Sequence, residues 1–240
     1  MRFWLLFALL APWLLYQARR TRRDTPRLPE ADGPQQATRG TGEPALRLLI
    51  IGESPVAGVG VTHQHDGLGP AIATPLSHHT GRAVHWHCHG TNGLRLHGLL
   101  AQPLPADDTA PDLILVMMGV NDTTALTPLR RWRADLHALI RTLTPHASVC
   151  FTPVPPMSRF TALPQPLRYV IGLRARQLDQ ALQDVCRDTG CPYLPYGDLA
   201  HPDLLARDGY HPSATGYQLM GASLAGQLIE KLFPLRQSDQ

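Results

Sequence analysis

Residues 47–54 of the chain read Arg-Leu-Leu-Ile-Ile-Gly-Glu-Ser, a short apolar run that ends in a glycine and two polar residues. A run of this length with a glycine at its end is typical of a strand that is buried on both faces of a sheet. We therefore predict a buried strand over Arg47–Ile51. Ser54 follows at the carboxyl end of that strand, which is the edge where parallel α/β sheets carry their binding and catalytic sites.

Other apolar runs follow along the chain, separated by longer amphipathic stretches. They predict strands at Ala83–His89, Leu113–Met118, Val149–Thr152 and, more briefly, Tyr193–Pro195. Apolar residues at helical spacing predict helices from Thr127-Pro128 to Leu143, over about Leu167–Val185, and from Ser213 onward. Strands that alternate with helices are typical of an α/β domain with right-handed crossovers and a parallel sheet.

The ends of the predicted strands carry short polar or glycine-rich blocks. Gly52-Glu53-Ser54 follows the first strand, and the next two strands are followed by Gly90-Thr91-Asn92-Gly93 and Gly119-Val120-Asn121-Asp122. A fourth block, Asp208-Gly209-Tyr210-His211-Pro212-Ser213, lies just before the last predicted helix. Because the carboxyl ends of parallel strands share one edge of the sheet, we expect these blocks to lie close together.

In this order, the four blocks resemble those of the SGNH hydrolases, the GDSL esterase and lipase family. That family is named for a Ser, a Gly, an Asn and a His, which here fall at Ser54, Gly93, Asn121 and His211. The resemblance covers most of residues 45–240 and implies a flavodoxin-like three-layer α/β/α fold with a five-stranded parallel sheet. Glu53 stands where the family has Asp. That acid is not a triad member, so the change bears on the local loop more than on the chemistry.

The residue types in these blocks suit nucleophilic catalysis. A serine hydroxyl is a weak nucleophile without an adjacent base, and His211 is the candidate base for Ser54. Asp208 lies three residues before His211 and can hold its Nδ1 hydrogen, which fixes the tautomer of the ring. The resemblance implies an oxyanion hole made by the backbone N–H groups of Ser54 and Gly93 and the side-chain amide of Asn121.

Each of these residues has a plainer interpretation when it is taken alone. Ser54 could be the N-cap of a following helix, and Asn121 and Asp122 could be turn residues. His211 and Asp208 could likewise be ordinary loop residues. The four blocks taken together favour catalytic roles, and we expect Asp122 to make a supporting hydrogen bond.

The sequence thus predicts a serine hydrolase that cleaves acyl esters through an acyl-Ser54 intermediate and needs no metal or organic cofactor. The resemblance leaves a lysophospholipid or a short-chain acyl ester as the substrate, with acyl thioesters and acetylated sugars as alternatives. Residues 153–166, which include Met157, Phe160 and Leu163, predict either an acyl-binding wall or a packed loop. A hypothesis of another class is a catalytically silent, membrane-tethered binding module on the same fold.

The N-terminus differs in composition from the rest of the 240 residues, of which 43% are hydrophobic and 17% charged. Residues 1–42 hold seven Arg and three acids, a net charge of +4, which leaves −1 for the remainder of the +3 total. The apolar run Phe3–Tyr16 would span about 21 Å as a helix, which is short for a bilayer core of about 30 Å. Arg19, Arg20, Arg22 and Arg23 follow the run, and this charge order favours an uncleaved anchor over a secretory signal.

We therefore predict a membrane anchor or signal-like segment over 1–18, a basic and then Pro/Gly-rich linker over 19–44, and a catalytic domain over 45–240. The positive-inside rule places the catalytic domain in the cytoplasm, with a periplasmic or secreted protein as the alternative. A buried N-terminal helix is a further possibility, because a run that is apolar all round can belong to a core. Since the positive charge is confined to the N-terminus, we expect no nucleic-acid partner.

Histidines at positions 85, 87 and 89 invite a metal hypothesis, because alternate residues of a strand share one face. No further ligand set follows them, so we expect an outward-facing edge strand with polar groups and no metal site. The segment Gly58-Val59-Gly60 lacks the third glycine of a dinucleotide-binding fingerprint. The expected partner is the substrate itself, a small-molecule or lipid acyl ester.

Overall fold

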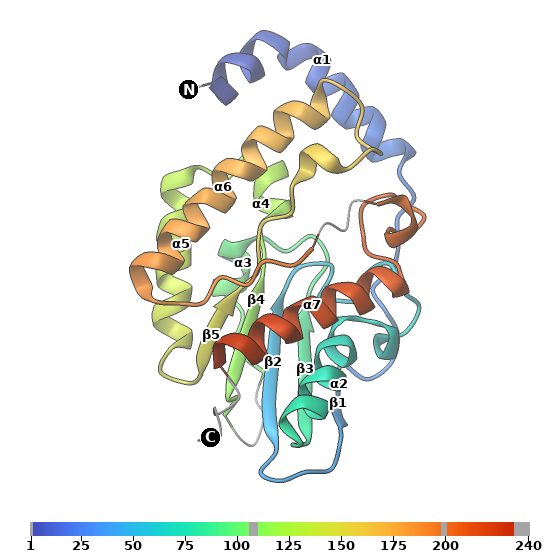
Figure 1. Ribbon diagram of the computed structural model, residues 1–240. Helices are drawn as coiled ribbons and strands as arrows, with labels where there is room; N and C mark the ends of the chain where they lie inside the picture. Colours follow the sequence, from blue (N-terminus) through green and yellow to red (C-terminus); the bar gives the residue numbers. More distant parts are fainter. Residues whose placement is uncertain (1, 106–109, 198–200, 233–240) are drawn as a thin grey trace, which may run out of the picture.

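A computed structural model describes residues 2–105, 110–197 and 201–232 of the chain. A five-stranded sheet lies at the centre, and helices cover both of its faces (Figure 1). The strand order is β1-β3-β2-β4-β5; β1 is antiparallel to β3, and every other neighbouring pair is parallel. The strands are β1 (Gln36–Arg39), β2 (Leu46–Gly52), β3 (Val84–Gly90), β4 (Leu113–Met117) and β5 (Ser148–Phe151). The predicted three-layer α/β fold is confirmed.

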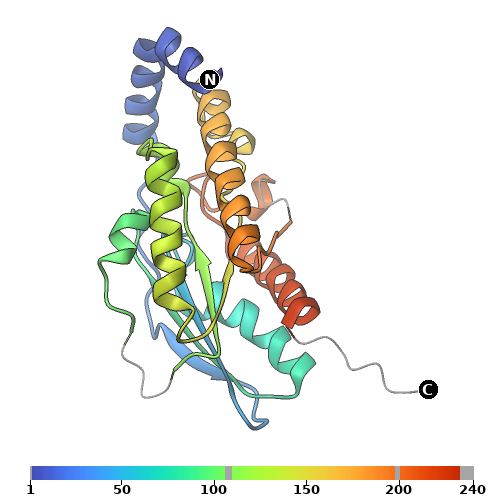
Figure 2. The ribbon, with the colours of Figure 1, turned by 90° about the vertical axis from the view of Figure 1, so that its left-hand side faces the viewer.

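The helices form two layers, seen edge-on in Figure 2. One layer packs α2 and α7 against the core that contains Leu48, Ile50 and Trp86. The other packs α5 and α6 against the core that contains Ile114 and Val116. The α-helices are α1 (Arg2–Asp24), α2 (Leu68–Thr80), α3 (Leu96–Leu100), α4 (Val120–Thr124), α5 (Leu129–Leu143), α6 (Leu167–Thr189) and α7 (Ala214–Leu232). The 3-10 turns are η1 (Gln64–Asp66), η2 (Met157–Arg159) and η3 (Pro202–Leu204).

The fifth strand is not the one that the sequence predicts. Tyr193–Pro195 makes only an isolated parallel bridge to Phe151, in which the Phe151 N–H donates to the Pro192 carbonyl and the Leu194 N–H donates to the Phe151 carbonyl. The next donor along β5 would be residue 153, a proline without an N–H, so the ladder ends there. The fifth strand is instead β1, which lies inside the predicted linker and pairs antiparallel with β3. The sheet is therefore mostly parallel. The β1 strand carries polar residues that are largely exposed, so no apolar pattern marks it in the sequence.

The histidine strand is also placed differently from the expectation. β3 lies between β1 and β2 and is not an edge strand. The exposed ring of His85 contacts the hydroxyl of Thr38 on β1. Within the described parts of the chain, no group of three or more His, Cys, Asp or Glu side chains is arranged to hold a metal ion.

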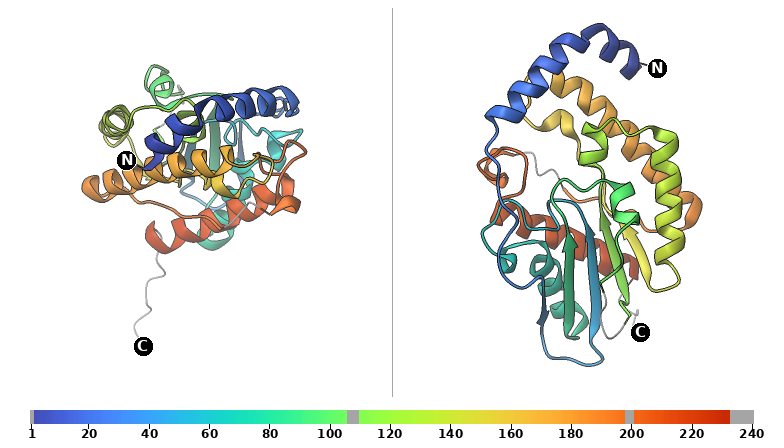
Figure 3. Two further views of the ribbon diagram at one scale, coloured as in Figure 1. Left: turned by 90° about the horizontal axis from the view of Figure 1, so that it is seen from above. Right: turned by 180° about the vertical axis from the view of Figure 1, so that it is seen from behind.

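The N-terminal helix α1 packs against the protein. Phe3 and Leu14 are buried, and the Arg174 guanidinium of α6 lies 5.5 Å from the centre of the Phe3 ring. The side chain of Gln17 donates to the carbonyl of Gln165 and accepts from the Leu167 N–H. Seen from above in Figure 3, α1 crosses the end of the molecule next to α6. No helix in the described ranges is both long enough and apolar enough to traverse a bilayer.

The sequence-based division into anchor, linker and catalytic domain differs from the observed elements at two points. α1 continues past residue 18 to Asp24, and the predicted linker contributes β1 to the sheet. Residue 1 of the predicted anchor, and residues 106–109, 198–200 and 233–240 of the predicted catalytic domain, lie outside the described residues.

Candidate active site

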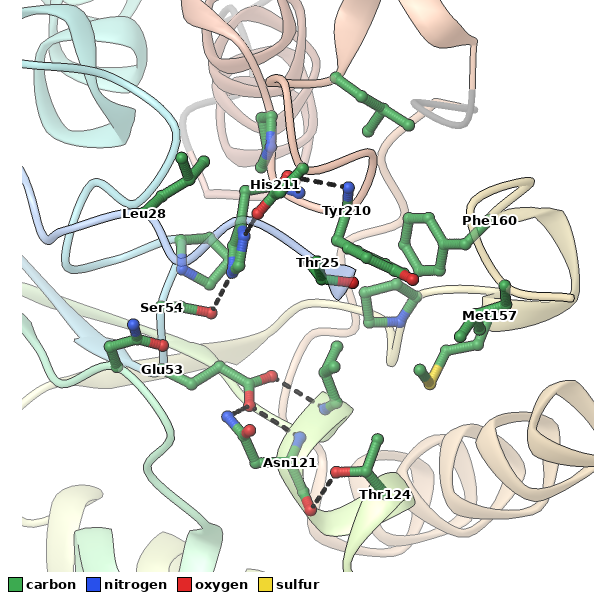
Figure 4. A pocket seen from close by; sticks show the side chains of 18 of the residues that line it. Thr25, Leu28, Glu53, Ser54, Asn121, Thr124, Met157, Phe160, Tyr210 and His211 are labelled. Atoms are coloured by element: carbon green, nitrogen blue, oxygen red, sulfur yellow. Dashed lines mark hydrogen bonds and ion pairs between the residues drawn. The ribbon is translucent and has the colours of Figure 1, made fainter. Parts of the chain in front are cut away.

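Ser54 lies directly beyond the carboxyl end of β2, where the chain leaves the sheet. Glu53 N donates to the Met117 carbonyl at the end of β4, and the Val59 N–H donates to the Ser54 carbonyl. These bonds fold residues 53–59 into a tight turn over the sheet edge. The Ser54 side chain is almost entirely buried, and its hydroxyl faces His211 (Figure 4).

His211 reaches Ser54 from the loop before α7. Its Nε2 lies 2.9 Å from the Ser54 Oγ, and its Nδ1 lies 2.5 Å from the Asp208 Oδ2. The close approach of this loop requires a glycine at position 60, because a Cβ there would lie 2.2 Å from the Pro212 carbonyl oxygen. The Tyr217 hydroxyl of α7 donates to the Val59 carbonyl at 2.7 Å and ties the two segments together.

Asp208 is held in place by its own loop. Its Oδ1 accepts the backbone N–H groups of Tyr210 and His211 at 3.0 and 3.1 Å, while Oδ2 faces the imidazole. Burial alone would raise the pKa of Asp208, but the hydrogen bonds from the His211 ring and these two backbone groups outweigh it and lower the pKa. The lowered pKa favours the charged carboxylate beside the His211 ring.

Asn121 lies at the start of α4, beyond the end of β4, and its amide is held by Glu53. Glu53 Oε2 accepts the Asn121 Nδ2 at 2.6 Å and the Asn121 backbone N–H at 3.1 Å, while Oε1 accepts the Val120 N–H at 2.9 Å. The Glu53 side chain is buried, and burial raises its pKa to about 7 although these three donors favour the charged form. An Nδ2 carries two hydrogens, so one remains for a ligand. This positioning role of Glu53 has no signal in the sequence.

The two backbone donors expected for the oxyanion hole are unused. The N–H groups of Ser54 and Gly93 have no hydrogen-bond partner among the residues that the structure describes, whereas the neighbouring Glu53 and Asn92 amides do. Gly93 has a φ of +82°, a conformation that other residues rarely adopt.

The remaining predicted residue, Asp122, is buried. It accepts the Leu96 N–H at 2.9 Å and the Thr127 hydroxyl at 2.7 Å, which joins the ends of α3, α4 and α5. The structure thus brings Ser54, His211 and Asp208 into one hydrogen-bonded chain, and the hydrogen bonds of Asp122 lie outside that chain.

A cavity of about 730 Å³ opens beside Ser54 and His211. Met157, Phe160 and Leu163 line it from the loop after β5, so the segment predicted as either an acyl wall or a packed loop does reach the cavity. The other wall comes from the N-terminal segment, which the sequence did not indicate as part of the site. It contains Thr21, Arg22, Thr25, Pro26, Arg27 and Leu28.

A serine, a histidine and a carboxylate that are hydrogen-bonded in this order recur in hydrolases on several unrelated folds, so the arrangement points to the class of serine hydrolases without fixing the family. Sequence comparison gives the particular family. A family profile described as GDSL-like Lipase/Acylhydrolase matches residues 50–219, and the chain belongs to this family. The predicted resemblance is therefore confirmed, and the protein is a carboxylic ester hydrolase.

Individual relatives agree with this assignment. The chain is 30% identical to a GDSL-like esterase of Mycobacterium tuberculosis over 214 residues, which cover 83% of this chain and 68% of the relative. Two crystal structures share the fold. One is the psychrotrophic esterase EstA from Pseudoalteromonas (TM-score 0.60, 18% identity, 77% of this chain and 97% of that one). The other is a lipase/acylhydrolase from Enterococcus faecalis (TM-score 0.57, 20% identity, 76% and 95%).

Proposed function

We propose that the protein hydrolyses acyl esters through a covalent acyl-Ser54 intermediate. The observation that carries this proposal is the chain of contacts from the Ser54 hydroxyl through His211 to Asp208. As Ser54 Oγ bonds to the ester carbonyl carbon, His211 Nε2 takes the hydroxyl proton and then gives it to the departing alkoxide. Water repeats the sequence with the same base, which releases the carboxylic acid and restores the serine.

The negative charge of each tetrahedral intermediate needs donors that are already in place. The free N–H groups of Ser54 and Gly93 and the remaining hydrogen of Asn121 Nδ2 supply three. Glu53 accepts the other Nδ2 hydrogen and so fixes the direction of the amide. A preorganised donor of this kind contributes about 3 kcal/mol to transition-state stabilisation.

The cavity supports a substrate with an apolar acyl chain. Its lining includes Met117, Met157, Phe160, Leu163 and Leu205, and an acetyl group on Ser54 would leave most of this apolar surface in contact with water. Arg22 and Arg27 lie exposed on the same lining, and neither guanidinium group makes a hydrogen bond or ion pair with another described residue. A guanidinium at the rim suits a phosphate group, so a lysophospholipid is the favoured substrate within this class.

Acyl-chain profiling tests the substrate proposal. With p-nitrophenyl esters from acetyl to octanoyl, kcat/KM should rise severalfold for each pair of added methylenes. The reason is that burial of a CH₂ group in the cavity contributes about 0.8 kcal/mol to the binding of the acyl chain. Phe160→Ser should flatten this rise and leave acetyl ester hydrolysis within a fewfold of wild type. A maximum at the acetyl ester would contradict an acyl-chain pocket and favour an O-acetyl esterase.

A comparison of oxoesters and thioesters with the same acyl chain distinguishes an esterase from the alternative, a thioesterase.

We also propose that the protein associates with a membrane through α1, with its catalytic domain on the cytoplasmic side. The inner face of α1 is used for packing, but Leu5 and Leu9 on the outer face are 70% and 75% exposed. Trp4, Trp13, Leu15 and Tyr16 are also about half exposed. Apolar and aromatic residues beside the basic run Arg19–Arg23 suit a helix that lies in the plane of an anionic bilayer surface.

Vesicle sedimentation tests this association. The full chain should sediment with vesicles that contain anionic phosphatidylglycerol and much less with pure phosphatidylcholine. The double variant Leu5→Ser/Leu9→Ser should reduce vesicle binding at least tenfold, since each leucine contributes about 1.5–3 kcal/mol when it is fully buried. Leu219→Ser, at a leucine on α7 that is 51% exposed, is the control and should bind like wild type. Equal binding by all three proteins would exclude α1 as the membrane contact.

A further inference from the structure

The loop that carries Gly93 is fixed by hydrogen bonds and has little packing to support it. Thr91, Asn92 and Gly93 are all exposed, and a Cβ on Gly93 would meet no atom within 4 Å. Glycine has the widest choice of backbone conformations, so a loop of this kind needs external constraints to hold one N–H direction.

Three hydrogen bonds supply the constraints. The Thr91 N–H donates to the Gly52 carbonyl at the end of β2, and the Leu94 N–H donates back to the Thr91 carbonyl. The Asn92 N–H donates to Glu30 Oε1 at 2.7 Å, across 62 positions of sequence. These bonds use every N–H from residue 91 to 94 except that of Gly93, within the part of the chain that the structure describes.

Glu30 is itself anchored next to the nucleophile turn. The following residue, Ala31, donates its N–H to the Ala57 carbonyl at 3.0 Å, and Asp32 pairs in both directions with Thr62 and Gln64. Ala31 also packs so closely on the turn that a Cβ on Gly58 would lie 2.6 Å from its methyl group. The segment before Glu30 lines the substrate cavity. Residues 30–32 thus join the Ser54 turn to the Gly93 loop.

From these contacts we infer that Glu30 is a positioning residue for ester hydrolysis, which holds the Gly93 N–H in the oxyanion hole through Asn92. This inference rests on the proposed acyl-Ser54 function and adds a residue outside the four catalytic blocks. The Glu30 carboxylate does not touch the substrate. Its loss frees the Asn92 N–H, widens the range of loop conformations and leaves the Gly93 donor poorly aligned when the negative charge develops.

Steady-state kinetics of Glu30→Ala test the inference. We expect kcat on a p-nitrophenyl ester to fall about tenfold to a hundredfold, less than for complete removal of an oxyanion donor, with KM within about twofold. Glu30→Gln keeps an oxygen acceptor for Asn92 and should restore kcat to within about threefold of wild type. An alkylboronic acid forms a tetrahedral adduct with the serine. Its inhibition constant should rise by the same factor by which kcat/KM falls.

Glu43→Ala is the matched control, because Glu43 is another exposed glutamate that accepts a backbone N–H, that of Ala45 at 2.8 Å, away from the cavity. It should leave kcat unchanged. The inference would be overturned if Glu30→Ala kept the kcat and the boronate affinity of the wild type. It would also be overturned if Glu30→Ala and Glu43→Ala lost kcat equally. Ser54→Ala, assayed in parallel, separates this outcome from failure of the proposed function: an active Ser54→Ala variant contradicts the acyl-enzyme itself.

Discussion

Ser54→Ala is expected to lower kcat for ester hydrolysis by about 10⁴–10⁶-fold, because the acyl-enzyme cannot form without the hydroxyl. The substitution removes one oxygen atom from a buried side chain, and the hydrogen bond lost with it is the one to the His211 ring. The backbone turn depends on the Glu53 and Val59 amides and does not involve the hydroxyl. The thermal unfolding midpoint should therefore stay within a few degrees of the wild-type value.

Ester turnover and thermal unfolding of the purified variant check this prediction. Ser148→Ala, at an exposed serine at the start of β5, controls for the loss of a hydroxyl elsewhere. It should retain wild-type kcat. A Ser54→Ala protein that is folded and still turns over ester within tenfold of wild type would show that another group is the nucleophile.

Asn121→Ala is expected to have the second largest effect, a decrease in kcat of about 10²–10³-fold with little change in KM. The amide should bind the oxyanion of the transition state more strongly than the carbonyl oxygen of the ground state, so its loss slows the chemical step. Glu53 makes this donor rigid, since its Oε2 lies 2.6 Å from the Asn121 Nδ2.

Gln180→Ala is the matched control for Asn121→Ala. Gln180 is an exposed residue of α6 whose amide donates to the Asp184 carboxylate at 3.2 Å, away from the cavity. Its removal should leave both kinetic constants unchanged. A change confined to KM in Asn121→Ala would mean that the amide binds ground state and transition state equally and is not an oxyanion donor.

The parts of the fold that the sequence predicts well are those with a strong local signal. The predicted ranges of β2, β3, β4 and β5 agree with the structure to within one residue at each end. β2, β4 and β5 are mainly apolar, as buried parallel strands require, whereas β3 alternates buried apolar residues with histidines. The polar blocks at the strand ends were expected to meet at one edge, and Ser54, His211 and Asp208 do so. Ser54 and His211 are 157 positions apart. The sheet places Ser54 at this edge, and the close approach at Gly60 and the Tyr217 hydrogen bond hold the His211 loop against it.

The parts that the sequence does not predict depend on hydrogen bonds to backbone groups that are distant in the sequence. β1 is held by backbone pairing with β3, which polar residues can make without any periodic pattern. Glu30 and Glu53 act through carboxylates that accept backbone N–H groups 62 and 67 positions away. A single glutamate in a loop gives no hint of such a partner, and the proline-rich composition of residues 24–44 is typical of a linker.

Mass spectrometry after reaction with a fluorophosphonate ester tests the central claim most directly, because this reagent bonds to an activated serine and reports which one. The protein is expected to gain one phosphonyl group per chain, mapped to the peptide that contains Ser54, and the Ser54→Ala variant is expected to gain none. An adduct on another residue, an unreactive wild-type protein, or equal labelling of the variant would contradict a Ser54 nucleophile activated by His211.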